Sequence, residues 1–280
     1  MKDDLVSMDD IDIRRSNAIT PDGVGIAYQM SGSGPALICG HAMGMDHSMY
    51  DRHRASFSQA HTMITFDQRG SGMSDHPPFE EGEHSAYTVE RFGDDLKAVL
   101  DDAGVEKAMI LGFSMGAVSA LSFATRWPER VDKLILASAM ASRLPQPIID
   151  RARQVEDMLE QRGVKETHEF YFSGPLFGGL IEQESTREQI VRGGEQATAH
   201  GFKGCFRVTI DRPSLVEHLH VIDSPTLIMV GETDTHYLAE AELLEREIKG
   251  AKRVVMPGVG HAMCAQRPEQ FESTVLEFIA

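Results

Sequence analysis

The sequence has little cysteine and no long apolar run. Its three cysteines, Cys39, Cys205 and Cys264, form no CxxC motif, which argues against a disulfide framework or a zinc site and favours a reducing compartment. No stretch of about 18 apolar residues is present, so no membrane-spanning helix is expected. Residues 1–15 are acidic and lack the apolar region of a signal peptide. By elimination, we expect a cytoplasmic protein.

Basic residues are also scarce. The 27 Lys and Arg face 43 Asp and Glu, which gives a net charge of −16 at pH 7. Such a charge repels nucleic acids and anionic membrane surfaces, so neither is expected as a partner. The sequence lacks a P-loop, an HExxH motif and a G-x-G-x-x-G motif after a strand, and His218 and His220 are too few to hold a metal. We therefore expect no cofactor and no metal.

What the sequence does contain is an alternation of short apolar runs and helical segments. Runs typical of buried strands lie at 36–39, 62–66, 108–111, 133–137, 225–230 and 253–256. Helical patterns between these runs lie near 48–59, at 89–103, with Thr88 as a candidate cap, and at 238–248. A hairpin around the turn at 21–23 precedes the alternation. This order predicts an α/β fold with a mostly parallel central sheet flanked by helices.

The alternation stops at residues 142–217, a helical and polar stretch with an aromatic cluster at 170–177. We predict that 142–217 forms a helical cap, inserted into an α/β core made of 1–141 and 218–280. The alternative is a long helical crossover that does not cover a site. A chain of 280 residues is long enough for one α/β unit with such an insertion.

The pentapeptide GFSMG at residues 112–116 fits the pattern G-x-S-x-G. It follows an apolar strand run and begins a helix, which is the context that this motif requires. The tight turn holds the serine in a strained conformation, and the flanking glycines remove side chains that would clash. We predict that Ser114 is a nucleophile, and that the backbone N–H of Met115, at a helix N-terminus, binds an oxyanion.

A general base and an acid that orients it are expected at the same edge of the sheet. His261 follows the strand run 253–256, and Asp234 follows the preceding one. Because parallel strands end at one edge, both side chains are predicted to lie near Ser114. Glu232 is the alternative acid. The chain order Ser, Asp, His is that of the α/β-hydrolases.

The second oxyanion donor is expected from the loop after the first parallel strand, residues 40–44. The backbone N–H of Met43 is the candidate. The side chain of His41, in the same loop, is expected to be structural.

Together these motifs resemble the α/β-hydrolase superfamily across nearly the whole chain. The matching segments are 40–43, 66–74, 112–116, 128–131, 231–234 and 260–261. The core most resembles the esterase, lactonase and enol-lactonase branch, including 3-oxoadipate enol-lactonases. The resemblance implies hydrolysis of a small ester or lactone through an acyl-serine intermediate, without metal or organic cofactor. His41-Ala42 departs from the usual His-Gly of the family.

Two other functions fit the same motifs. One is hydrolysis of a C–C bond in a ring-cleavage diketone, and the other is ligand sensing by a receptor on a hydrolase scaffold. The sequence leaves open the acyl and alcohol groups of the substrate. It also leaves open whether the chain forms a homo-oligomer.

Overall fold

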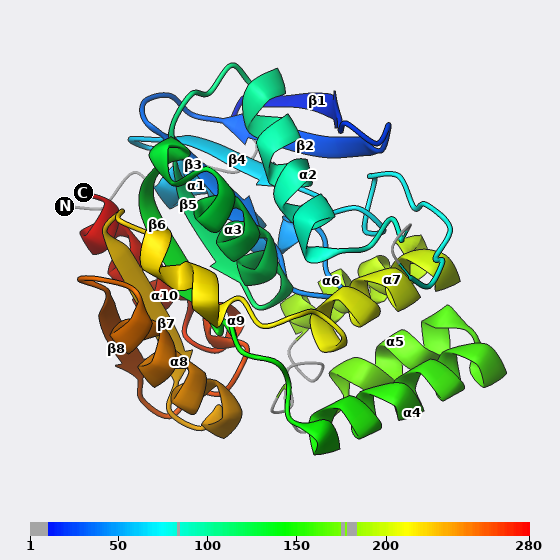
Figure 1. The fold of residues 1–280 in the computed structure, drawn as a ribbon. Coiled ribbons are helices and arrows are strands. Elements are labelled where there is room, and N and C mark those ends of the chain that lie inside the picture. Colours follow the sequence, from blue (N-terminus) through cyan, green and yellow to red (C-terminus); the bar gives the residue numbers. More distant parts are fainter. Residues whose placement is uncertain (1–10, 83–84, 175–176, 178–183) are drawn as a thin grey trace.

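The structure is a computed structural model, and it describes residues 11–280 except 83–84, 175–176 and 178–183 (Figure 1). The strands are β1 (Ile13–Ile19), β2 (Gly25–Ser31), β3 (Ala36–Gly40), β4 (Thr62–Phe66), β5 (Ala108–Phe113), β6 (Val131–Ala137), β7 (Thr226–Gly231) and β8 (Lys252–Met256). They form one sheet in the order β1-β2-β4-β3-β5-β6-β7-β8. Pairs β1–β2 and β2–β4 are antiparallel, and the other pairs are parallel.

The central strands are buried on both faces, as their continuous apolar sequences predict. In β5, Ile110 packs in one hydrophobic cluster, whereas its neighbours Met109 and Leu111 pack in the other. Alternate residues of one strand thus supply two cores, one on each side of the sheet.

Helices cover both faces of the sheet (Figure 1). Those along the core chain are α1 (Asp51–Phe57), α2 (Val89–Asp102), α3 (Met115–Arg126), α8 (Thr235–Glu247), α9 (Met263–Gln266) and α10 (Pro268–Ile279). Apolar residues of α2, α3 and α8 belong to one cluster, and those of α1, α9 and α10 belong to the other. The predicted α/β fold with a mostly parallel sheet flanked by helices is confirmed.

The stretch between β6 and β7 is helical, as its sequence predicts. It contains α4 (Gln146–Arg162), α5 (Val164–Phe172), α6 (Glu184–Gln196) and α7 (Ala199–Ile210), and a 3₁₀ turn, η6 (Val216–Val221), follows. Helix α5 reaches the loop after β3, where His168 Nε2 donates to the Gly44 carbonyl at 2.6 Å. Helix α7 packs closely against the loop after β4. A Cβ on Gly201 would lie only 2.4 Å from the Gly70 carbonyl oxygen, so the contact requires a glycine.

Local differences from the predicted elements lie at helix ends. The helix expected near 48–59 is a 3₁₀ turn, η2 (His47–Tyr50), followed by the short α1. Helix α8 begins at Thr235, earlier than its apolar periodicity indicates, and α9 was not predicted. Over the residues that the structure describes, no helix has the length and apolarity needed to cross a bilayer.

Candidate active site

Ser114 lies at the turn between β5 and α3. Its φ of 53° and ψ of −110° lie outside the conformations that ordinary residues prefer. The backbone N–H of Ser114 donates to the Ala137 carbonyl of β6 at 2.9 Å, which holds this turn against the neighbouring strand. The predicted strained serine turn is therefore present.

Both glycines of the pentapeptide are required by close backbone contacts. A Cβ on Gly112 would lie 2.7 Å from Ala117 Cα, on the first turn of α3. A Cβ on Gly116 would lie 2.1 Å from the carbonyl oxygen of Gly40, where β3 ends and the loop with Met43 begins. Helix α3 can approach both β5 and this loop only because these positions carry no side chain.

The structure brings the three predicted side chains together. His261 Nε2 lies 3.0 Å from Ser114 Oγ, and His261 Nδ1 lies 2.8 Å from Asp234 Oδ2. Asp234 and His261 are 5% and 3% exposed, so their hydrogen bond is largely shielded from water. The alternative acid, Glu232, is exposed, and its carboxylate accepts from the Gly258 backbone instead.

Ser138, which no motif in the sequence marks, supports this arrangement. Ser138 directly follows β6 and has a φ of 45°, in the left-handed region that is unusual for a serine. Its hydroxyl donates to the His261 carbonyl at 3.0 Å and lies 3.4 Å from Asp234 Oδ2. No sequence signal marks Ser138, because its role depends on two residues about a hundred positions away.

Tyr237 was also not identified from the sequence. It lies in the first turn of α8, one turn after Asp234, and its ring centroid is 4.5 Å from that of His261. Its position three residues after the predicted acid is the only signal that could have found it.

The loop that carries Met43 is fixed by His41, whose side chain is fully buried. His41 Nδ1 donates to the Ala42 carbonyl, and His41 Nε2 accepts from the Gln68 backbone N–H at 3.0 Å. Burial lowers the pKa of His41, against the charge of Asp67, so the neutral ring fits this pattern of one donor and one acceptor. These contacts support the structural role expected for His41.

Met43 and Met115 lie in two backbone segments that meet beside Ser114. Gly40 of β3 pairs with Gly112 of β5, and the loop after β3 touches the first turn of α3 through Gly116. Both methionine side chains are buried. Met115 is the first residue of α3, so its N–H is one of the groups that have no partner within the helix.

A cavity of about 280 Å³ opens beside His261. Phe113, Ala42, Phe172 and Phe177 line it together with His261. The remaining lining residues are Met45, Met49, Arg52, Thr186, Gln189, Ala262, Cys264 and Ala265. Most of these side chains are apolar, so the cavity suits an apolar group with a few polar contacts at Arg52, Thr186 and Gln189.

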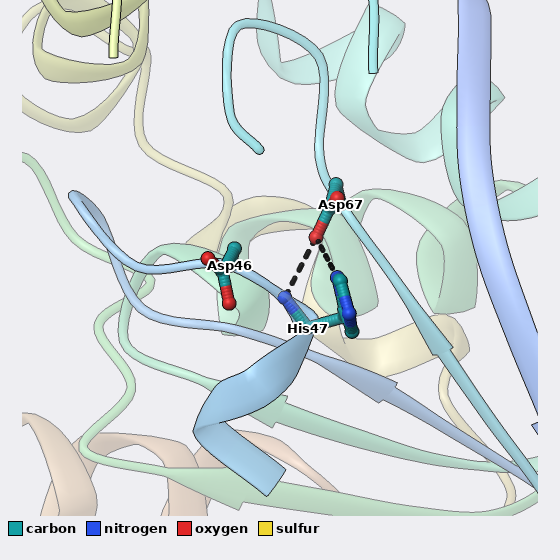
Figure 2. Close-up of side chains that lie close together, drawn as sticks. All are labelled: Asp46, His47 and Asp67. Atoms are coloured by element: carbon teal, nitrogen blue, oxygen red, sulfur yellow. Dashed lines mark hydrogen bonds and ion pairs between the residues drawn. The ribbon is translucent and has the colours of Figure 1, made fainter. Parts of the chain in front are cut away.

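One cluster of metal-ligand types occurs among the described residues, formed by Asp46, His47 and Asp67 (Figure 2). Its atoms already have protein partners. Asp67 Oδ1 accepts from the His47 backbone N–H at 2.7 Å and from His47 Nδ1 at 2.8 Å. Asp46 Oδ1 accepts from the Ser48 backbone N–H, and His47 Nε2 lies 2.8 Å from Gln29 Nε2. These hydrogen bonds explain why the three residues lie together: they hold Asp67, in the loop after β4, against His47.

Comparison with known proteins finds a matching family model and relatives of similar sequence. The family described as "alpha/beta hydrolase fold" matches residues 35–165. The 3-oxoadipate enol-lactonase 1 of Acinetobacter baylyi is 25% identical over 253 residues, which cover 89% of this chain and 91% of that protein.

Solved structures agree over most of the chain. A hydrolase from Pseudomonas aeruginosa superposes with a TM-score of 0.83 at 27% identity, over 95% of this chain and 98% of that one. A thermophilic esterase from Thermogutta terrifontis gives 0.82 at 24% identity, with the same coverage. The chain therefore has the α/β-hydrolase fold, and it is similar to an enol-lactonase and to a hydrolase and an esterase of known structure.

Proposed function

We propose that the protein is a serine hydrolase that cleaves a carboxylic ester or a lactone through an acyl-serine intermediate. Ser114 is the nucleophile, His261 the general base and Asp234 the residue that orients the base. The observation that carries the proposal is the continuous line of hydrogen bonds from Asp234 through His261 to Ser114. It ends at a serine on a strained turn, which is the arrangement that activates a hydroxyl.

The first half of the reaction forms the acyl-serine. His261 Nε2 takes the proton of Ser114 as Oγ attacks the acyl carbon. The backbone N–H groups of Met43 and Met115 bind the resulting oxyanion, each contributing about 3 kcal/mol to the barrier reduction. Asp234 holds the imidazole in one tautomer and stabilises its cation. The proton then passes from His261 to the leaving oxygen as the acyl C–O bond breaks.

The second half releases the acid. Water gives a proton to His261 Nε2 and attacks the acyl carbon, and His261 returns that proton to Ser114 Oγ as the ester bond to serine breaks. These steps require neither metal nor organic cofactor, and we propose that the protein uses none.

We also propose that residues 142–217 act as a cap over the site, inserted into a core of 1–141 and 218–280. Two contacts support this role. Helix α5 is hydrogen-bonded to the loop that follows β3, and Phe172 and Phe177 form part of the cavity beside His261. The substrate is then a small molecule with an apolar group that fits between this segment and the core.

A cytoplasmic location and the lack of nucleic-acid partners are proposals that rest on composition. Cys39, Cys205 and Cys264 are buried free thiols, as a reducing compartment allows. The net charge of −16 opposes binding to polyanions.

The proposed nucleophile is tested with Ser114→Ala. We expect kcat for p-nitrophenyl acetate to fall about 10⁴-fold or more, because no other group can form the acyl intermediate. Labelling by a fluorophosphonate, which needs the same oxygen, should disappear. The matched control is Ser273→Ala on the outer side of α10, where the exposed hydroxyl bonds only to a backbone carbonyl of its own helix. It should hydrolyse and be labelled like the wild type.

Full activity of Ser114→Ala would refute the assignment. Esters, lactones and ring-cleavage diketones, assayed side by side, then separate the reaction classes. Turnover of the diketones alone would favour C–C hydrolysis over ester hydrolysis. Ligand binding without turnover of any substrate would favour a receptor.

A further inference from the structure

Tyr237 occupies a position next to the proposed catalytic residues without a role in the reaction described so far. Helix α8 begins directly after Asp234, and Tyr237 follows in its first turn. Its ring is tilted by 54° against the His261 imidazole, with 4.5 Å between the ring centroids. The half-buried side chain packs on the hydrophobic cluster that α3 and α8 share.

The hydroxyl of Tyr237 lies among the polar groups of the site. Burial raises its pKa well above 10, and the nearby Asp234 carboxylate raises it further. The charge of Arg212 and the nearby Ser114 hydroxyl act in the opposite direction. The group therefore keeps its proton at neutral pH and can donate a hydrogen bond near Ser114.

The expected position of the leaving group follows from the same geometry. In the tetrahedral intermediate the acyl carbon is bonded to Ser114 Oγ, and its oxyanion points to the N–H groups of Met43 and Met115. The leaving oxygen must lie within reach of His261 Nε2, because that atom protonates it. The ring of Tyr237 lies against the same imidazole, with 4.5 Å between the ring centroids.

We propose that Tyr237 is a further catalytic residue, whose hydroxyl donates a hydrogen bond to the leaving-group oxygen of the substrate. The inference rests on the proposed serine hydrolase function and extends it. As the acyl C–O bond breaks, the proton on His261 Nε2 moves to the leaving oxygen and the carbonyl double bond reforms. Tyr237 keeps its own proton and stabilises the negative charge that the oxygen carries before it is protonated.

Such a bond matters most for poor leaving groups. An alkoxide develops a localised charge, whereas p-nitrophenolate spreads its charge over the ring and needs little help. We expect Tyr237→Phe to lower kcat/KM for alkyl acetates about 10- to 100-fold, as for the loss of one hydrogen bond to a charged group. The loss for p-nitrophenyl acetate should be several times smaller. The measurement is kcat/KM, which reports acylation, over a series of acetates that differ only in the pKa of their alcohol.

The matched control is Tyr87→Phe. Tyr87 is a buried tyrosine whose hydroxyl donates to the Pro77 carbonyl, away from the proposed nucleophile. Its loss should change all members of the series by the same factor. Fluorophosphonate labelling of Tyr237→Phe, in which fluoride leaves, should proceed at close to the wild-type rate and shows that the site is folded. If the phenylalanine variant does not fold, Tyr237→Met removes the same hydroxyl with a flexible side chain and carries the same expectation.

An equal fall for good and poor leaving groups would overturn the inference, and so would unchanged kcat/KM for the alkyl esters. Both outcomes leave the proposed function intact as long as Ser114→Ala is inactive. Activity of Ser114→Ala, in contrast, would remove the proposed function itself, whatever Tyr237→Phe does.

Discussion

Asp234 shows how much of the proposed mechanism depends on a single side chain. Its carboxylate holds His261 Nδ1 at 2.8 Å and is 5% exposed. A buried acceptor at this atom fixes the imidazole with its proton on Nδ1, which leaves Nε2 free to accept the proton of Ser114.

Replacing this acid by its amide tests the orientation. In Asp234→Asn the amide can present an N–H to Nδ1 and favour the wrong tautomer, so we expect kcat to fall about 10⁴-fold with little change in folding. Ester hydrolysis and a thermal unfolding curve check both parts.

Glu232→Gln is the control for Asp234→Asn. The exposed Glu232 carboxylate accepts from the Gly258 backbone, and a glutamine can still accept there. Near-wild-type activity is expected. A large loss in this variant with none in Asp234→Asn would transfer the proposed role to Glu232.

Single site residues can be predicted from the sequence where they directly follow a strand. Ser114, Asp234 and His261 each follow an apolar run, and parallel strands end at a common edge, so their meeting could be inferred. Ser138 and Tyr237 could not be inferred in the same way. Ser138 has no motif, and the reach of Tyr237 toward His261 depends on where α8 begins.

Among the helices, α8 connects the proposed cap to the proposed site. The chain leaves β6 through Ala141 and Ser142, and the Glu240 carboxylate of α8 accepts from both backbone N–H groups at 3.1 Å. It also accepts from the Ser142 hydroxyl. On the return path, the buried Arg212 donates to the Ala141 carbonyl at 3.1 Å. Both connections of the 142–217 segment are thus tied to one point beside α8.

The carboxylate of Glu240 is expected to be a main anchor of this junction. Glu240 is 9% exposed, so Glu240→Ala leaves two backbone donors without their charged acceptor. We expect the free energy of unfolding to fall by about 1.5–3 kcal/mol and proteolysis within 142–217 to become faster. Urea unfolding and timed digestion measure the two effects.

The same helix offers a control in Glu242. This exposed residue is paired with Arg253 at the surface, and Glu242→Ala should change the free energy of unfolding by less than about 1 kcal/mol. Equal effects of the two alanine variants would show that the junction is not anchored through Glu240.

Helix and strand identities could be predicted where periodicity is strong, as for α2 with its Thr88 cap. The start of α8 could not be predicted, because its first turn consists of polar and aromatic residues that lack the apolar periodicity of an amphipathic helix.

For the whole molecule, the parallel class of the sheet could be predicted from the strand-helix alternation. The strand order could not, because it depends on which long-range pairs bury the most apolar surface. The position of β4 between β2 and β3 is one such case, since no local signal in the sequence specifies it.

The stability of the whole molecule is expected to depend on pH through the ion pair between the buried Asp67 and the partly buried His47. Burial would raise the pKa of Asp67, but the hydrogen bond and charge of His47 outweigh it and the pKa is lowered from 3.8. Burial would lower the pKa of His47, but Asp67 raises it above 6.5. The Asp67 contribution is complete above pH 3.8 and is lost as the pH falls further. The His47 contribution is complete below pH 6.5 and is lost as the pH rises through its folded-state pKa.

Asp67→Asn should therefore destabilise most between about pH 4 and 6.5, by about 1–3 kcal/mol. Toward pH 3 the difference from the wild type should shrink, and it should also shrink well above pH 7. Urea unfolding at a series of pH values measures it. A difference that is constant from pH 3 to 9 would show that ionisation of the pair does not contribute.

Helix α8 has a consequence for how such a protein can change over evolution. Asp234, directly before the helix, bonds the His261 imidazole, and Glu240, six residues further on, bonds the start of the 142–217 segment. The proposed cap and the proposed catalytic residues are therefore attached to the same helix, and the cap cannot be replaced without an effect on them. A segment transplanted from a relative will work here only if it brings a backbone or hydroxyl donor for Glu240 at the graft point. Without that donor, the replacement would also disturb the position of His261, the proposed general base.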